Sequence, residues 1–165
     1  MTRANTKLGD VFSIKIDDKF KKYIQYIAND LTQLNSDVIK VFKETYSIKS
    51  TPDLSEVVKG DIDFYAHTVT KWGIKLGYWE KVGNIPDVGT IDVLFRDTND
   101  YGSKPGEQTK VSNNWYVWKI NEQFKQIGKL EGEYQKAEIG VVIPAINIVH
   151  RIRTGEYNFE YPQYK

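Results

Sequence analysis

The chain has 165 residues, of which 40% are hydrophobic and 27% are charged, a balance typical of one globular domain and unlike disordered or fibrous proteins. Its 23 Lys and Arg nearly match its 22 Asp and Glu, so the net charge of +1 argues against general binding to nucleic acid or anionic lipid. The absence of cysteine excludes disulfides, thiolate metal sites and cysteine nucleophiles.

Hydropathy and composition also bear on location and fold. No apolar run approaches the roughly 20 residues that span a bilayer, and the N-terminal segment has no signal-peptide core, so we expect one complete cytoplasmic domain over residues 1–165 with no membrane partner. Aromatic residues make up 13% of the chain. This enrichment favours β-sheet and contact surfaces.

The N-terminal quarter predicts strands. Residues 11–16 form a short extended segment led by Gly9-Asp10. Residues 20–43 fit both an amphipathic helix and two strands, but the turn formers at 29–30 and 35–37 would interrupt a helix. We therefore expect strands near 22–28 and 37–43, with room for a short helix at 31–35.

Residues typical of helix ends predict one short helix over residues 51–60, with Thr51 as its cap, Pro52 at its first position and Gly60 at its end. Residues 62–70 are β-rich. In residues 72–84, large apolar residues alternate with glycines that indicate turns, bends or bulges. A further strand is expected over residues 90–96.

The C-terminal half begins with a turn-rich span, residues 97–114, which predicts an exposed loop. Strands are expected at 115–120 and 138–143. A helix is expected over 144–154, with Ile146, Val149 and Ile152 spaced along one face and Gly155 beyond its end, followed by an extended aromatic tail that packs against the body. The fold class we expect is α+β and mostly β: a twisted antiparallel sheet, curled or barrel-like, with one C-terminal helix and one or two short helices.

The search for chemistry finds no catalytic motif. The two histidines fall in different segments: His67 is read as a structural histidine, and His150, followed by Arg151 and Arg153, as part of a solvated or partly buried helix face. Asp97 begins a partial calcium-loop pattern, but Tyr101 and Gln108 stand at two of its ligand positions. We expect no metal, no cofactor and no enzymatic activity.

The tryptophans allow two interpretations. In the strand at 115–120, Trp115 and Trp118 point to opposite faces. They can fill the core between sheet and helix, or they can form an aromatic partner-binding patch, because Trp and Tyr combine a large contact area with little lost entropy.

Two stretches carry a family resemblance. The segment KLGDVFSIKI, followed by KYIQYIANDLTQLNSDVIKVF and later by IDFYAHTV, resembles the immunity protein 26 family, small proteins predicted to protect bacteria from polymorphic toxins. The resemblance lies in hydrophobic spacing with a Gly-Asp start and covers residues 7–43 best. It implies a mostly β fold and inhibition by binding, and it carries over no catalytic residue.

The resemblance therefore implies a non-catalytic immunity protein that binds and neutralises a cognate bacterial toxin. The expected partner-binding residues belong to the acidic loop and the strand after it: Asp97, Asp100, Tyr101, Glu107, Trp115 and Trp118. One alternative is a small carbohydrate- or peptide-binding module that uses exposed aromatics. Another is a small hydrolase, which would require a histidine beside a carboxylate in a pocket.

Overall fold

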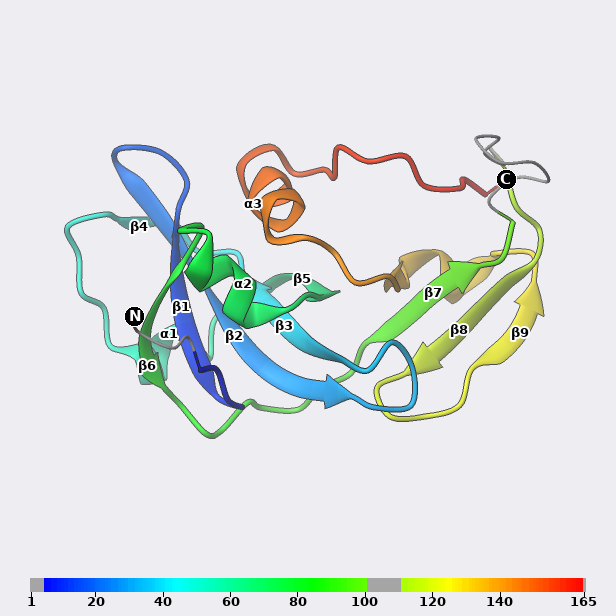
Figure 1. Ribbon diagram of the computed structural model, residues 1–165, viewed down its shortest axis with the longest axis horizontal. Coiled ribbons are helices and arrows are strands. Elements are labelled where there is room, and N and C mark those ends of the chain that lie inside the picture. The colour runs from blue at the N-terminus through cyan, green and yellow to red at the C-terminus, as the bar shows by residue number, and fades with distance from the viewer. Residues whose placement is uncertain (1–4, 101–110, 165) are drawn as a thin grey trace.

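Two β-sheets and three α-helices make up the part of the protein that the computed structural model describes, residues 5–100 and 111–164 (Figure 1). Sheet A has the strand order β5-β3-β2-β1-β6, all antiparallel, and a short strand β4 pairs with the start of β2. Its strands are β1 (Asp10–Lys15), β2 (Phe20–Asp30), β3 (Ser36–Phe42), β4 (Tyr46–Ser47), β5 (Ile62–His67) and β6 (Glu80–Asn84).

The β2-β3 hairpin resolves the ambiguity of residues 20–43 in favour of strands. Ile24 pairs with Val41 and Tyr26 with Ile39, and the chain turns through residues 31–35, with no helix there. Residues 23–27 of β2 are all buried because both faces of the strand are covered. A strand that is apolar on both faces shows no clean alternation, which explains why it also fits a helical spacing.

Sheet B has the order β10-β7-β8-β9 and is built from later parts of the chain. Its strands are β7 (Leu94–Thr98), β8 (Trp115–Lys119), β9 (Lys125–Gly128) and β10 (Glu138–Ile139). The β10 strand lies parallel to β7, whereas the other pairs are antiparallel. The mostly β, largely antiparallel prediction is confirmed, but both sheets stay open and do not close into a barrel.

The helices are α1 (Leu54–Val57), α2 (Thr70–Lys75) and α3 (Ala145–Thr154), with a 3-10 helix over Gly132–Lys136. The predicted cap of α1 was wrong, because Asp53 accepts a hydrogen bond from the Ser55 amide and the helix starts after it. Sequence analysis missed α2. Residue 73 of this helix is glycine because the Trp79 ring packs in the place where a side chain would lie. None of the described helices has the length and apolar character to cross a membrane.

The C-terminal helix and tail link the two sheets. Gly155, in the left-handed conformation, ends α3 as predicted. Ile148 and Ile152 pack on sheet A, whereas Ile146, which was expected on the buried face, is exposed. Beyond α3 the tail runs towards the far end of sheet B (Figure 1), and Tyr157 and Phe159 lie half-buried against the core as expected.

One buried carboxylate joins the two sheets. Asp30, at the end of β2, is completely buried. Its Oδ2 accepts hydrogen bonds from His67 Nε2 on β5 and Trp118 Nε1 on β8, both at 2.8 Å. Its Oδ1 accepts from the Asn121 amide at 3.1 Å. Because a buried charge is tolerated only when it is hydrogen-bonded, this contact fixes sheet B against sheet A.

We expect Asp30→Asn to lower the free energy of unfolding by about 3–5 kcal/mol, because the amide nitrogen would face donors in place of an acceptor. Chemical denaturation of the purified protein measures this change. Asp92→Asn is the matched control, since Asp92 is exposed and meets Lys119 only at 3.9 Å. Equal losses in the two variants would contradict the role given to Asp30.

Candidate functional site

The predicted partner-binding tryptophans lie in the core. Trp115 is 0% and Trp118 2% exposed, and their indole nitrogens donate to the Ser112 carbonyl and to Asp30. The core interpretation is thus confirmed for both, and their predicted role in partner contact is wrong, because a partner cannot reach them in the folded chain. Tyr101 and Glu107 lie outside the described residues.

The two aspartates beside them are engaged within the fold. Asp97 is buried in β7, not exposed in a loop as expected, and it accepts hydrogen bonds from the Tyr161 hydroxyl at 2.8 Å and the Tyr116 hydroxyl at 3.3 Å. Asp100 accepts from Ser112 Oγ and Asn114 Nδ2, both at 2.9 Å. These carboxylates hold the chain together at this end of sheet B.

The double substitution Asp97→Lys, Asp100→Lys should therefore lower the free energy of unfolding by at least about 2 kcal/mol, because it buries an ammonium group beside former hydrogen-bond donors. Thermal and chemical unfolding give the readout. The pair Asp18→Lys, Asp92→Lys changes the net charge equally at exposed positions. If both doubles unfold alike, net charge rather than hydrogen bonding is responsible.

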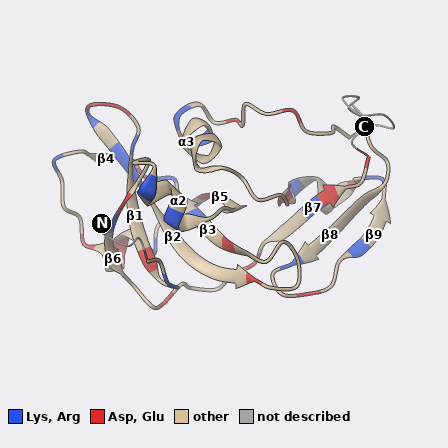
Figure 2. Ribbon diagram, viewed as in Figure 1, with Lys and Arg blue, Asp and Glu red and all other residues tan. Residues whose placement is uncertain are grey.

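The exposed tryptophan is Trp72, on α2. It is 48% exposed, and Leu76, Val142 and Ile146 around it are 62%, 40% and 56% exposed. Trp72, Leu76 and Val142 line an apolar cleft of about 210 Å³ beside the start of α3. We call these four residues the α2–α3 patch. Lys75 Nζ lies 5.0 Å from the Trp72 ring centre, and Figure 2 shows the basic residues of α2.

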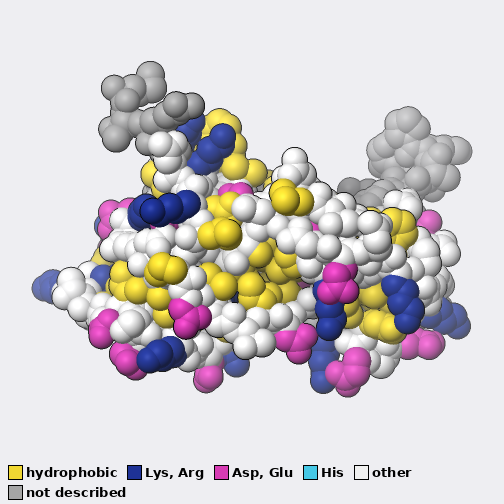
Figure 3. All heavy atoms as spheres, turned by 90° about the horizontal axis from the view of Figure 1, so that it is seen from below, with side chains coloured by type: hydrophobic (Ala, Val, Ile, Leu, Met, Phe, Trp, Pro, Cys, Tyr) yellow, Lys and Arg dark blue, Asp and Glu magenta, His cyan; other side chains and the backbone are white. Residues whose placement is uncertain are grey.

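Exposure alone does not distinguish this patch. Figure 3 shows hydrophobic side chains across the middle of the face seen from below, with charged side chains of both signs around them. Single exposed apolar residues are normal on protein surfaces. What sets the α2–α3 patch apart is that Trp72, Leu76 and Val142 line one cleft where the neighbouring helices α2 and α3 meet, with Ile146 following on α3.

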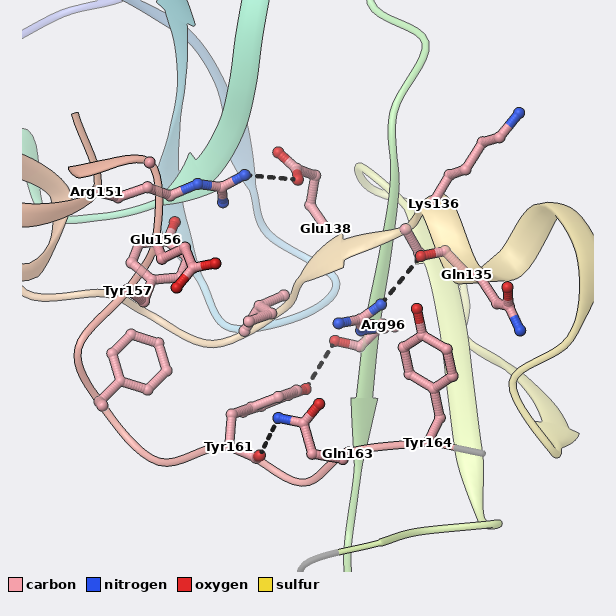
Figure 4. Close-up of a pocket in the computed structure, with 14 residues that line it drawn as sticks. Arg96, Gln135, Lys136, Glu138, Arg151, Glu156, Tyr157, Tyr161, Gln163 and Tyr164 are labelled. Atoms are coloured by element: carbon pink, nitrogen blue, oxygen red, sulfur yellow. Dashed lines mark hydrogen bonds and ion pairs between the residues drawn. The ribbon is translucent and has the colours of Figure 1, made fainter. Parts of the chain in front are cut away.

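A second hollow, the tail pocket, lies between β7, β10, α3 and the C-terminal tail (Figure 4). Its volume is about 510 Å³. Its lining includes Arg96 from β7, Glu138 from β10, Arg151 from α3, and Tyr157 and Tyr164 from the tail. Residues distant in sequence thus meet because the tail runs back along sheet B.

The Arg96 guanidinium lies close to two aromatic rings. Its guanidinium carbon lies 5.5 Å from the Trp115 ring centre and 5.3 Å from that of Tyr164. Nη1 donates to the Gln135 carbonyl at 3.2 Å. Its Nε is buried and has no hydrogen-bond partner. The guanidinium is therefore fixed in place with a donor left unused.

Arg151 lies across the pocket beside Glu138. Its Nη2 is 3.7 Å from Glu138 Oε1, and the guanidinium covers the rings of Phe64 and Tyr157. Glu138 Oε2 accepts from the Tyr65 amide at 2.5 Å. Burial raises the pKa of Glu138, although Arg151 and Arg96 lower it in part.

The hydroxyl of Tyr157 is the second unused polar group of the tail pocket. It is buried beside Arg151, which can only donate to the hydroxyl oxygen, so the hydroxyl proton has no acceptor. Burial raises its pKa far above the ordinary tyrosine value, so the hydroxyl keeps its proton. The pocket thus contains a second buried donor.

A hydrolase would require a histidine beside a carboxylate in an accessible pocket. His67 and Asp30 form such a pair, but both side chains are fully buried. Burial lowers the pKa of His67 against the opposing effect of Asp30. Burial also raises that of Asp30, but the hydrogen bonds from His67, Trp118 and Asn121 outweigh it and lower the pKa overall. Neutral His67 therefore donates to an ionised Asp30 in a place that substrate cannot reach.

Folding stability should fall as the pH drops below 6.5, the ordinary histidine pKa. The unfolded chain then protonates His67 while the folded chain does not, which costs up to about 1.4 kcal/mol per pH unit. Urea unfolding between about pH 5 and 8 measures this slope. His67→Gln should flatten it, whereas His150→Gln should preserve it. An unchanged slope in His67→Gln would contradict the assignment.

Sequence reasoning missed the residues of the tail pocket. Arg96 could have been suspected, since alternation with buried Phe95 places it on the opposite face of β7. Arg151 was read as part of a solvated helix face, and only the tertiary fold brings it to Glu138. No group of three or more potential metal ligands occurs among the described residues. In comparisons with known proteins, no family model, curated protein or solved structure matches the chain.

Proposed function

We propose that this protein is a non-catalytic immunity protein that binds a cognate bacterial toxin and neutralises it. The observation that supports this proposal is the α2–α3 patch, where Trp72 and Leu76, 48% and 62% exposed, line one cleft and Ile146, 56% exposed, lies on the neighbouring helix. Large apolar and aromatic side chains of this kind supply most of the energy of protein–protein interfaces. The partner we propose is a protein whose apolar side chain fills the cleft.

The patch stands on a rigid base. The Thr70 hydroxyl and amide at the start of α2 both donate to Asp37 Oδ2, at 2.7 and 2.9 Å. The Trp79 indole nitrogen donates to the Thr70 carbonyl at 3.0 Å, and its ring packs against Gly73. A partner would therefore meet side chains on a preformed surface, which reduces the entropy lost on binding.

Charge around the patch favours one kind of partner surface. Lys71 and Lys75, both exposed, belong to the same helix as Trp72. We propose that the toxin surface is apolar at its centre and acidic at its rim, because opposite charges at the rim speed association. Asp97 and Asp100 are not anchors in this proposal, since their carboxylates already accept hydrogen bonds within the protein.

The test is capture of the toxin by the tagged protein in its native bacterium, identified by mass spectrometry, followed by affinity measurement and growth protection with the purified pair. The double substitution Trp72→Ser, Leu76→Ser should weaken binding by about 30-fold or more, equivalent to about 2 kcal/mol, and should remove protection.

The matched control is Leu31→Ser, Phe124→Ser, which removes two apolar side chains of similar exposure elsewhere on the surface. It should bind the toxin as the unaltered protein does. Equal affinity of the patch double and this control would refute the patch as the binding surface. Failure to capture any toxin-like chain while its locus is expressed would refute the immunity function itself.

A further inference from the structure

We propose that the tail pocket binds a small organic anion, a carboxylate or phosphate attached to a flat ring. This inference goes beyond toxin binding and does not depend on it. It rests on unused donors, charge and aromatic walls that meet in one hollow of about 510 Å³ (Figure 4). That volume falls within the range of about 300–1,000 Å³ typical of small-molecule sites.

The unpaired polar groups of the pocket are hydrogen-bond donors, so a ligand that binds them must supply acceptors. Arg96 Nε is buried without a partner, and the proton of the buried Tyr157 hydroxyl has no acceptor, because its neighbour Arg151 can only donate. The guanidinium of an arginine stays protonated in proteins and can only donate, and the Tyr157 hydroxyl keeps its proton. Because buried donors are normally hydrogen-bonded, a ligand that supplies oxygen acceptors would complete both groups.

Two guanidinium groups of the lining can bind an anion. Arg96 and Arg151 face the pocket together with two carboxylates, Glu138 and Glu156, whereas Lys136 points away from it and pairs with Glu133 at 3.1 Å (Figure 4). The separation of 3.7 Å between Arg151 Nη2 and Glu138 Oε1 is longer than a hydrogen bond, so the guanidinium of Arg151 retains donors for a ligand. Its side chain is 22% exposed and can therefore be reached from solvent.

The walls favour a ring on the ligand. The Tyr157 and Phe159 rings are stacked with centres 5.0 Å apart, and Tyr161 and Tyr164 also line the pocket. The Tyr164 ring lies against the Arg96 guanidinium, so a ring that enters beside it would continue an existing stack. Aromatic walls around two guanidinium groups suit a flat ring with an anionic substituent.

The experiment is an NMR titration of the full-length, ¹⁵N-labelled protein with three probes: adenosine 5′-monophosphate, indole-3-acetate and inorganic phosphate. The side-chain Nε–H signals of arginine report directly on the unused donor. We expect adenosine monophosphate or indole-3-acetate to shift the Arg96 Nε–H signal and the Tyr157 backbone signal, with saturation by about 5 mM. The identity of the stronger probe distinguishes a phosphate from a carboxylate head group.

Arg96→Lys should weaken the binding about tenfold or more, because lysine lacks the planar set of donors. Arg153→Lys is the matched control, since Arg153 lies on the same helix as Arg151, outside the pocket, and donates to the Lys15 carbonyl. If Arg96→Lys does not fold, Tyr157→Phe removes the other donor and should weaken binding in the same direction.

The proposal fails if none of the three probes shifts a signal of the pocket by about 5 mM, or if the Arg96 and Arg153 variants bind the probes equally well. Equal binding of inorganic phosphate and adenosine monophosphate would overturn the part of the proposal that concerns the ring. The toxin takes no part in this experiment, so its outcome leaves the immunity function to its own test.

Discussion

The buried carboxylate of Asp30 is the interaction on which the arrangement of the two sheets depends. An ionised group without solvent must be compensated locally, and Asp30 draws its donors from β5, from β8 and from the chain after β8. Both side-chain donors, His67 and Trp118, lie outside the β2-β3 hairpin that carries Asp30. Sheet B must therefore dock where Trp118 can reach, and the charge gives an otherwise apolar interface a defined register.

The position of the tail pocket follows from this contact. The Phe95 ring lies 4.2 Å from the His67 ring and thus belongs to the same buried layer as Asp30. Since side chains alternate along a strand, Arg96 must point away from that layer, towards α3 and the tail. There Trp115 supports its guanidinium, and the Tyr161 hydroxyl donates to the Arg96 carbonyl and to Asp97. The tail is thereby drawn along β7, and this closes one side of the pocket.

Sequence reasoning succeeded where the signal is local and failed where it is tertiary. Turn formers at 29–30 and 35–37 correctly divided β2 from β3, and Gly155 correctly ended α3. The same local logic treated Asp30 as a turn residue, because its donors lie 37 and 88 residues away. Helix α2 was missed because glycines usually indicate turns. Only the structure shows that the Trp79 ring occupies the place where a side chain at Gly73 would lie. Burial of Trp115 and Trp118 could not be decided, since core and interface favour the same residue type.

The α2–α3 patch and the tail pocket use different sides of one helix. Ile146 and Arg151 are five residues apart on α3, and at 3.6 residues per turn their side chains point about 140° away from each other. A protein that covers Ile146 and Trp72 would therefore leave Arg151 and the tail accessible. Each surface also has its own support: α2 rests on Asp37 and Trp79, whereas the pocket is formed by β7, β10 and the tail. The proposed protein-binding patch and the proposed anion pocket therefore depend on different supporting residues.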